Sequence, residues 1–556
     1  MPSEAYDFVL KPKGILQDIQ KSARLVWGRV CGLLSLGVRT GHLSLLFGPI
    51  LCFGLPLYMA GCLSNRLLIR WIRWSLARAG ATFIKLGQWA ATRPDVLPEV
   101  FCEELARLHA NAPGHGMAWN EKVIQNAFGK SIEDVFEEFD PVPVGSGTIA
   151  QVHRARIRRQ GHQSRTVAVK ISHPRIEEII SDDLLLLSAF ARVAHVLIPP
   201  LRWISLPDEV SCFAVMMRQQ LDLRFEAFTL HRFTQNFEGT SKAWGHLARI
   251  KFPRPQFPWV SARCLVEELI EDALPIGEIQ NLLANTTPVE SAHVRRDLAV
   301  LGFRGFLQML LWDNFVHADL HPGNILVTFV EMPRRIPRTE IGEFLESFPR
   351  RVWNLLGSVE RMMQRIVTPG TLPPNPRDPI KIRKLPGESD EKFLERQLSN
   401  PRAMAQIVFL DTGLVTELSR PDFKNFTDLF QALVLKGDGY TVGELMIDRS
   451  PTQAQENVRD RDGFCRGMSE IVKPIFAARK LAVATGKVTS LRDLRLDVVL
   501  NKLFQLARKH HVRIDAAYTN LVMSLLCVEG LGRQLAPEMD LRPLLAQAAL
   551  QYLIHK

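Results

Sequence analysis

The eight residues His317–Asn324, which read His-Ala-Asp-Leu-His-Pro-Gly-Asn, constrain the fold of this chain more than any other stretch. They place Asp319 and Asn324 five residues apart, with Pro322 and Gly323 turning the backbone between them. This is the H-x-D-x-x-x-x-N spacing of loops that transfer phosphoryl groups. In such loops the carboxylate faces the attacking hydroxyl or water, and the amide oxygen binds a Mg²⁺ ion that bridges the phosphates. A polar turn after a helix would also fit the stretch, so other parts of the chain must decide.

An upstream segment supplies groups that could hold phosphates. Residues 145–152 have the form G-x-G-x-x-A-x-V, and Thr166–Ile171 reads as a strand that carries Lys170. Glycines let backbone amides approach phosphate oxygens, and the lysine adds a positive charge for the α- and β-phosphates. The predicted nucleotide-binding residues around this loop are Val144, Gly145, Gly147, Val152 and Lys170.

The helical stretch Phe213–Phe237 carries two acidic residues four positions apart, Asp222 and Glu226, which one helix would place on one face. A kinase needs a helix glutamate to position the phosphate-binding lysine. Glu226 is the first candidate for that role and Asp222 the second, while a solvated acidic face is the structural alternative.

Two later segments fit the same core. Cys264–Ile270 is an apolar run that turns polar, as a hinge between lobes would, and the backbone of Glu268 and Ile270 would meet adenine there. The expected metal-binding aspartate is Asp411, at 411 − 324 = 87 residues past Asn324. With Asn324 it forms the predicted Mg²⁺ ligand pair.

An insertion at 328–405 accounts for this long interval. Its first part has apolar residues at helical spacing from Ile341 to Ile366 and arginines on the other side. This pattern predicts a helix or helix pair docked on the protein, with a membrane-surface helix as the alternative. Thr368–Asp390 is rich in proline and is predicted to be disordered. Everything after Asp411 reads as helices.

The N-terminal part of the chain has the character of a membrane segment. No charged residue lies between Arg39 and Arg66, and Leu43–Leu63 is long and apolar enough to cross about 30 Å of hydrocarbon. A re-entrant hairpin and a buried core hairpin are the alternatives. The segment that follows carries cationic and aromatic residues suited to a headgroup layer, namely Arg66, Arg70, Trp71, Arg73 and Trp74. Residues 1–40 are basic and amphipathic, as a targeting segment or an interfacial helix would be.

Composition sets wider limits. A chain of 556 residues is too long for one compact core, so two lobes are expected. Its 69 basic and 58 acidic residues give a net charge of +11, which favours anionic partners such as nucleotides or lipid headgroups. The basic residues are dispersed, so a nucleic-acid interface is not expected. The eight cysteines form no C-x-x-C pair and read as reduced thiols.

Five motifs in this order resemble those of the UbiB, or aarF-domain-containing, family of atypical kinases. They are K-x-G-Q at Lys85–Gln88, R-P-D-x-L-P at Arg93–Pro98, A-Q-V-H at Ala150–His153, the loop His317–Asn324, and D-T-G at Asp411–Gly413. The resemblance covers roughly residues 78–535 and is greatest to the subgroup called aarF-domain-containing kinase two.

The resemblance implies an α+β, two-lobed protein-kinase-like fold. In this chain the fold would carry an N-terminal region at 1–65 with one transmembrane segment and a helical extension at 66–140. The kinase-like domain would follow at 141–556, divided into an N-lobe at 141–270 and a C-lobe at 271–556. Lys85 and Gln88 would face the nucleotide, and Asp319, Lys170 and Glu226 would be the catalytic residues.

The resemblance also implies cofactors and a cellular setting. The cofactors would be ATP and Mg²⁺, and the role would be support of coenzyme Q biosynthesis at the mitochondrial, and specifically inner, membrane. A membrane lipid or quinone precursor and coenzyme Q biosynthetic proteins would be the partners.

Two departures from the family pattern leave alternatives open. The family usually has an alanine-rich loop, associated with suppressed phosphoryl transfer, where this chain has Gly-Ser-Gly-Thr from Gly145. The first glutamate of the family's E-x-D motif is Gln220 here, so the role of that carboxylate is in doubt. The alternatives to an atypical kinase or ATPase are a nucleotide-gated scaffold or lipid-binding pseudokinase, and a conventional protein Ser/Thr kinase.

Overall fold

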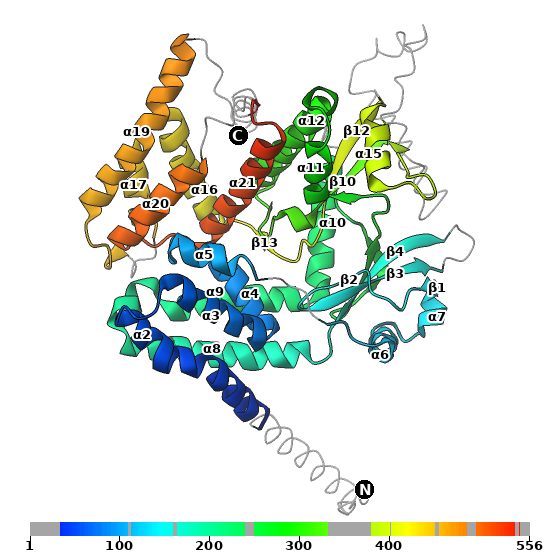
Figure 1. The fold of residues 1–556 in the computed structure, drawn as a ribbon, viewed down its shortest axis with the longest axis horizontal. Helices are drawn as coiled ribbons and strands as arrows, with labels where there is room; N and C mark the ends of the chain where they lie inside the picture. Colours follow the sequence, from blue (N-terminus) through cyan, green and yellow to red (C-terminus); the bar gives the residue numbers. More distant parts are fainter. Residues whose placement is uncertain are drawn as a thin grey trace, which may run out of the picture. The chain divides into compact units, whose positions relative to one another are not determined.

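The computed structural model describes residues 34–108, 113–158, 164–239, 249–331, 380–400, 402–450, 455–485, 496–539 and 544. The chain divides into two compact units. The first comprises residues 1–131, 140–153 and 170–221, and the second comprises 132–139, 154–169 and 222–556. Figure 1 gives the element labels used below.

The first unit is built mainly from helices. Figure 1 shows α3, α4, α8 and α9 as one group, in which α3 packs on α4, α4 on α8, and α8 on α9. Its elements are η1 (Ile50–Gly54), α2 (Leu55–Met59), α3 (Asn65–Ala79), α4 (Ala81–Ala91), α5 (Glu99–Leu105), α6 (Met117–Phe128), β2 (Gly145–Ser146), α8 (Ile176–Leu197), η2 (Pro199–Ile204) and α9 (Leu206–Leu221).

A continuous helix, Leu34–Met59, contains η1 and α2 and is long and apolar enough to cross a membrane. It includes most of the predicted span 43–63 but begins earlier and ends at Met59. Its first half is docked on the first unit: Leu43, Leu46 and Phe47 pack against the cluster formed by Leu76, Ala79 and Phe83. The predictions for residues 1–33 lie outside the described residues.

A six-stranded sheet with the order β1-β3-β4-β7-β6, and β2 paired to β3, begins the kinase-like part of the chain. Its other strands are β1 (Phe136–Phe139), β3 (Ala150–Ile157), β4 (Arg165–Ser172), β6 (Pro255–Val260) and β7 (Cys264–Glu268). Alternation of apolar and polar residues in β3 and a buried apolar run in β4 explain why these segments form strands. The division between units passes through β3 and β4, so residues 150–153 and 170–172 belong to the first unit.

A second sheet in the second unit has the order β11-β10-β12-β5, with β8 on β10, and a two-stranded sheet joins β13 to β9. The remaining elements are α7 (Ile132–Val135), α10 (Leu223–Gly239), β5 (Ile250–Lys251), β8 (Leu274–Pro275), α11 (Ile276–Ala284), α12 (Pro288–Leu307), η4 (Gln308–Trp312), β9 (Val316–His317), η5 (Pro322–Asn324), β10 (Ile325–Glu331), β11 (Ile380–Lys381), α15 (Asp390–Leu398), β12 (Ala403–Phe409), β13 (Val415–Thr416), α16 (Arg420–Phe430), η6 (Gln431–Lys436), α17 (Gly439–Asp448), α19 (Arg461–Thr485), α20 (Leu496–His510) and α21 (Ala516–Leu535).

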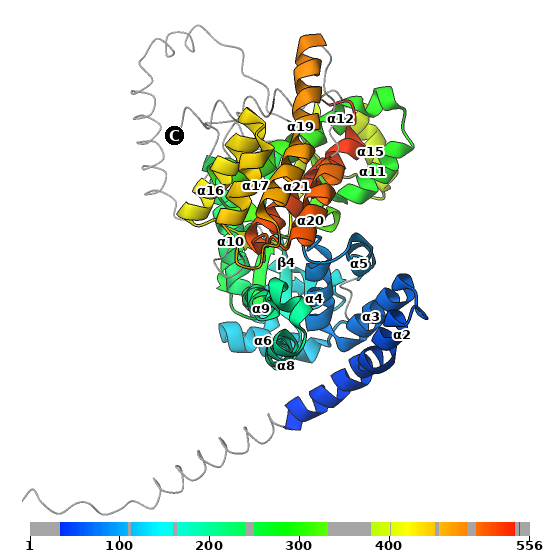
Figure 2. The same ribbon diagram turned by 90° about the vertical axis from the view of Figure 1, so that its left-hand side faces the viewer.

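The core of the second unit joins α10, α12, α21 and the sheet of β10 and β12. Stacked and tilted phenylalanines fill its centre: the rings of Phe233 and Phe252 lie 4.6 Å apart and those of Phe233 and Phe315 also 4.6 Å. A smaller cluster under α17, α19 and α20, which Figure 2 shows side by side, contains Phe464, Cys465 and Met468. Among the described residues after Asp411, the predicted helices are confirmed, apart from the short strand β13.

The prediction of one helix over Phe213–Phe237 is wrong. The chain forms two helices, and Asp222 stands between them. The Asp222 carboxylate accepts hydrogen bonds from the backbone N–H of Arg224 at 3.0 Å and from its guanidinium at 2.6 Å. Aspartate competes in this way with the helical backbone and favours a helix start, so Asp222 and Glu226 do not share a helix face.

The segment that separates β10 from β12 is shorter than the predicted insertion 328–405. Strands β10 and β12 pair without a break from Ile325 opposite Phe409 to Glu331 opposite Ala403, so the two ends of the predicted 328–405 segment are strand. Helix α15 lies within it. The predicted helix at 341–366 and residues 368–379 of the proline-rich segment fall outside the described residues. The prediction of disorder is wrong for the rest of that segment, because Ile380–Lys381 form β11, which pairs with β10.

Candidate functional site

Two strand pairings bring the loop after β9 and the D-T-G loop together. On one side Ile325 of β10 pairs with Phe409 of β12, and on the other His317 of β9 pairs with Val415 of β13. The Leu410 N–H donates to the Asn324 carbonyl at 2.9 Å, next to Asp411. The antiparallel register therefore sets Asn324 beside the D-T-G loop although many residues separate them in sequence.

His317 supports this loop from the buried side. Its Nε2–H donates to the Leu410 carbonyl at 2.9 Å, and its Nδ1 accepts the Asp319 N–H at 3.3 Å. Burial lowers the pKa of His317, so the ring is neutral and can donate at one nitrogen and accept at the other. The histidine thereby links Leu410 to Asp319.

Asn324 is oriented by the same loop. Its Nδ2 donates to the Asp319 carbonyl at 3.0 Å, so the amide oxygen is the atom directed elsewhere. His321 is exposed and accepts the Gly323 N–H at 3.1 Å, which caps the turn η5. The proline–glycine turn thus presents Asn324 as the motif predicts.

Glu226 lies beside the D-T-G loop. A methyl group built on Gly413 would lie 3.4 Å from Asp411 Oδ1 and 3.8 Å from Glu226 Oε2, so both carboxylates face that glycine. One turn along α10, the Thr229 hydroxyl is 2.8 Å from the Thr412 carbonyl and 2.9 Å from its hydroxyl. Glu226 is buried, which disfavours the alternative of a solvated acidic face.

The glycine loop forms a hairpin in the first unit. Gly145 pairs with Val152, the Val144 N–H donates to the Val152 carbonyl at 2.8 Å, and the Gly147 N–H donates to the Ala150 carbonyl at 2.9 Å. Space beside Gly145 is open, so a phosphate could approach its backbone without a Cβ in the way. Lys170 lies on β4, as predicted.

The K-x-G-Q segment is part of α4, where two of its residues contact the chain after α5. A Cβ on Gly87 would lie 2.2 Å from Leu108 Cδ1, so a larger residue would require the Leu108 side chain to shift. Gln88 Nε2 donates to the Leu108 carbonyl at 3.0 Å. In this structure Gln88 therefore binds backbone of the first unit, and its predicted contact with a nucleotide remains a prediction, as does that of Lys85.

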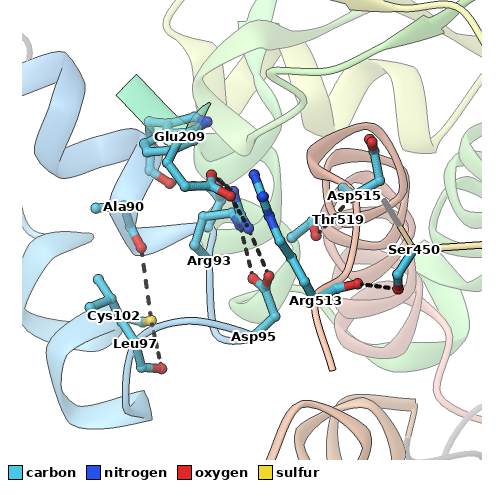
Figure 3. A network of polar contacts seen from close by, with 12 residues as sticks. Ala90, Arg93, Asp95, Leu97, Cys102, Glu209, Ser450, Arg513, Asp515 and Thr519 are labelled. Atoms are coloured by element: carbon cyan, nitrogen blue, oxygen red, sulfur yellow. Dashed lines mark hydrogen bonds and ion pairs between the residues drawn. The ribbon is translucent and has the colours of Figure 1, made fainter. Parts of the chain in front are cut away.

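The R-P-D motif builds a buried ion network shown in Figure 3. Arg93 binds Asp95 through two hydrogen bonds of 2.9 and 2.8 Å and also pairs with Glu209 of α9. Burial alone would lower the pKa of Arg93, but the hydrogen bonds and charges of Asp95 and Glu209 together raise it. Because all three side chains are buried, the motif fastens the segment after α4 to α9.

At the predicted hinge, the Glu268 N–H donates to the Arg254 carbonyl at 2.9 Å, and its carboxylate binds Lys251 Nζ at 2.5 Å. Because the N–H and the carboxylate of Glu268 already have partners, the predicted contact with adenine would use its carbonyl oxygen. Ile270 follows just beyond the end of β7.

The donors at the loops suit Mg²⁺. Asp411 offers a carboxylate and Asn324 an amide oxygen, the hard oxygen ligands that Mg²⁺ prefers, and Mg²⁺ is commonly held by one or two carboxylates plus phosphate oxygens and water. Among the residues described, no group of three His, Cys, Asp or Glu side chains is placed to hold a metal by itself. The residues thus fit a metal that arrives with a nucleotide.

The motifs predicted the polar residues of the candidate site but not the contacts that support them. Thr229, Thr412 and His317 act through contacts that no motif spacing encodes. Arg232 and Glu417, which form a paired ion bridge of 2.8 and 2.9 Å beyond the D-T-G loop, were also missed. Only the position of His317, two residues before Asp319, was a usable signal.

Comparison with known proteins gives two family matches. An ABC1 atypical kinase-like domain matches residues 107–342, and a UbiB helical domain matches residues 486–540. An ABC1 family protein of Schizosaccharomyces pombe, named as mitochondrial, is 34% identical over 95% of this chain and 72% of its own length. A probable protein kinase UbiB of Pseudomonas fluorescens is 28% identical over 84% of this chain and 69% of its own length.

The solved structure of Rv3197 with erythromycin from Mycobacterium tuberculosis matches 81% of this chain and 87% of its own chain. The TM-score is 0.39 and the identity 19%, values too low to support an inference about fold or function.

Proposed function

Because this chain belongs to the ABC1, or UbiB, family of atypical kinases, we propose that it binds ATP with Mg²⁺ and transfers or hydrolyses the γ-phosphate at a mitochondrial membrane. The observation that carries the proposal is the double strand pairing that sets Asn324 beside the loop of Asp411. We further propose support of mitochondrial lipid metabolism and coenzyme Q biosynthesis, with a membrane lipid or quinone precursor as the substrate class and the inner membrane as the location.

Each site residue has a proposed task. Asp319 orients the attacking hydroxyl or water, and Asn324 and Asp411 hold Mg²⁺. When bound, the metal neutralises charge that develops on the phosphate oxygens. Lys170, positioned by Glu226, binds the α- and β-phosphates. The hinge and loop residues proposed to hold adenine and phosphates are Val144, Gly145, Gly147, Val152, Glu268 and Ile270, with Lys85 and Gln88 from the helical extension.

ATP turnover by purified protein tests this proposal. The assay uses vesicles containing anionic phospholipid, with and without quinone precursors. Asp411→Asn removes one metal ligand and should lower turnover on the order of 10²-fold. Asp462→Asn is the matched control, because Asp462 is an exposed residue on α19. Equal turnover in Asp411→Asn and the wild type would exclude the proposed role of Asp411.

The two alternative functions, a scaffold or pseudokinase and a conventional protein kinase, predict different results for the same purified protein. A nucleotide that raises the melting temperature while wild-type turnover stays at background would indicate a scaffold or pseudokinase. Phosphorylation of generic peptides would indicate a conventional protein kinase. Both would contradict the proposed lipid-linked activity.

A further inference from the structure

Three histidines form a hydrogen-bonded chain behind the glycine loop. They are His115, which precedes α6, His153 on β3, and His173, just after β4. His115 Nδ1 lies 2.8 Å from His173 Nδ1, and His173 Nε2 lies 2.9 Å from the carbonyl of Gly147. All of these residues belong to the first unit.

Gln151 fixes the state of His153. Its Oε1 accepts the His115 N–H at 2.8 Å and its Nε2 donates to the His115 carbonyl at 3.1 Å, so the amide cannot be reversed. The same Nε2 lies 2.8 Å from His153 Nε2, which must therefore accept. His153 Nδ1 carries the proton and donates to the Asp140 carbonyl at 2.8 Å. Burial lowers the pKa of His153, in keeping with a neutral ring.

Asn120 bonds to both His153 and His115, so the protonation of His153 determines which nitrogen of His115 carries a proton. Since His153 Nε2 is an acceptor, the Asn120 Nδ2 at 3.1 Å donates to it. Asn120 Oδ1 then accepts a proton from His115 Nε2 at 2.7 Å. His115 Nε2 is therefore protonated.

The two ends of the chain require an additional proton. Four contacts each need a proton on an imidazole: His153 to Asp140, His115 to Asn120, His115 to His173, and His173 to Gly147. Three neutral imidazoles carry three protons. With all four contacts made as hydrogen bonds, the His115–His173 pair therefore holds one proton more than two neutral rings would.

The surroundings favour His173 as the site of this proton. The pKa of His115 is lowered, first by burial and further by the nearby His173 and His153, against the hydrogen bond that His115 donates to Asn120. Asp140 is the carboxylate that faces His153. Arg175, two residues past His173, is neutralised by Glu178 at 2.9 Å on the first turn of α8. The shared proton then forms an Nδ1–H bond from His173 to His115.

His173 holds the turn of the glycine loop at two points. Its backbone N–H donates to the Ile149 carbonyl at 2.8 Å, and its ring donates to the Gly147 carbonyl. In a planar trans peptide the C=O and the following N–H point in opposite directions. Fixing the Gly147 carbonyl on His173 therefore turns the Thr148 N–H away from His173, as a group that binds phosphate must be.

We propose that the His115–His173 pair binds a proton and, in that state, positions the Gly147–Thr148 peptide for phosphate, so that nucleotide affinity falls as pH rises. The proposal rests on the proposed nucleotide binding at the glycine loop. His173 is a positioning residue, because it acts through the backbone of the loop. Loss of the shared proton leaves His173 with one ring proton. When that proton lies on Nδ1 and keeps the bond to His115, Nε2 has none to donate and the Gly147 carbonyl is freed.

The test measures the affinity of the full chain for a fluorescent ATP analogue with Mg²⁺ between about pH 6 and 8.5, the range around the ordinary histidine pKa. His173→Gln keeps an N–H donor for Gly147 but cannot titrate, and His173→Leu removes the donor. His293→Gln on α12, where the ring is exposed, is the control. The wild type and the control should lose affinity about tenfold more than His173→Gln across this range, the size expected for one charge-assisted hydrogen bond. His173→Leu should bind weakly throughout.

A second readout does not depend on nucleotide. In apo protein labelled with ¹⁵N-histidine, His153 should carry its proton on Nδ1 between about pH 6 and 8.5. The His115–His173 pair should show three protonated ring nitrogens at the low end of this range and two at the high end, a change that His115→Phe abolishes. Identical pH dependence of binding in the wild type and His173→Gln would overturn the inference and leave the proposed function standing. Absence of binding in the wild type would refute the proposed function, and the labelled spectra would still decide whether the pair holds a proton.

Discussion

Removal of Arg93 should strongly lower the free energy of unfolding of the first unit. Its guanidinium lies buried between two carboxylates, and Arg93→Ala would leave Asp95 and Glu209 charged without their partner. Breaking such a buried pair typically costs about 3–5 kcal/mol. Urea unfolding should show a loss of that order, and Arg93→Lys should recover only part of it because an ammonium lacks the planar fork of donors.

Arg175→Ala serves as the comparison. Its ion pair with Glu178 joins side chains that are 69% and 64% exposed, so the change should be under about 1 kcal/mol. Equal losses for Arg93→Ala and Arg175→Ala would contradict the importance assigned to the buried network.

Asp313 should give the stability of the second unit a pH dependence. Burial raises its pKa to about 6, against the smaller effects of a hydrogen bond from Gln308 and the charge of Arg232. An unfolded aspartate titrates near 3.9. Between these values the folded state binds a proton that the unfolded state does not, so stability falls as pH rises from about 4 to 6 and then levels off.

Asp313→Asn cannot ionise and keeps the Oδ1 acceptor for Gln308. The melting temperature of the variant should therefore exceed that of the wild type increasingly from about pH 4 to 6, and the difference should stay constant above that range. Asp462→Asn should follow the wild type. Parallel curves for Asp313→Asn and the wild type would show that Asp313 does not titrate in this window.

The site residues could be predicted because each sits in a local sequence context that fixes its geometry. The Pro322–Gly323 turn determines how Asp319 and Asn324 are presented. Asp411 could be predicted because a metal-binding aspartate is expected after this loop in the chain. The partners of these residues could not be predicted. Glu209 lies 116 residues from Arg93, and Leu410 lies 93 residues from His317. Only folding brings such groups together, so the spacing of residues in the sequence does not predict these contacts.

At the scale of elements, the helix Leu34–Met59 is both a candidate membrane span and a packed part of the first unit. Arg39 binds Asp183 of α8 at 2.6 and 2.8 Å, and the Asp183 side chain is fully buried. The phenyl rings of Phe47 and Phe83 lie 5.5 Å apart. Removal of this helix therefore does more than release the protein from a membrane.

Two truncations separate these roles. Deleting residues 1–33 keeps the contact of Arg39 with Asp183, whereas deleting residues 1–65 removes it. The longer deletion should therefore have the lower melting temperature and increase proteolysis of α3, α4 and α8. The second deletion leaves Asp183 without Arg39, a change that typically costs several kcal/mol, about 3–5. Adding Asp183→Asn to that deletion should restore part of the loss. A 1–65 deletion as stable as the 1–33 deletion would show that the helix does not support the unit.

The periodicity of apolar residues did not predict the boundary between α9 and α10. Phe213–Phe237 has the apolar spacing of one long helix, and the local hydrogen bonds of Asp222 to Arg224 divide it into α9 and α10. The division leaves Glu226 in the first turn of α10, with Thr229 one turn later against Thr412. A polar residue that can cap a helix outweighed the propensity of its neighbours.

At the scale of the whole molecule, the order of motifs predicted the family fold and the chain length predicted two lobes, but the residues at which the compact units divide were not predicted. The sequence favours a boundary between lobes near residue 270. The compact units divide the chain within β3 and β4, so that residues 154–169 belong with the second unit. The boundary between lobes near residue 270 stays a prediction.

Asp411 shows how the molecule balances two demands on one position. Its φ of 49° lies in the left-handed region, where a residue with a side chain costs about 1–2 kcal/mol relative to glycine. The hydrogen bonds that Leu410 makes with Asn324 and His317 hold the backbone there. Selection for thermal robustness alone would favour glycine at this position. The carboxylate proposed to hold Mg²⁺ therefore carries a standing thermodynamic disadvantage, and a copy of the chain that no longer needs the metal would gain stability by replacing Asp411 with glycine.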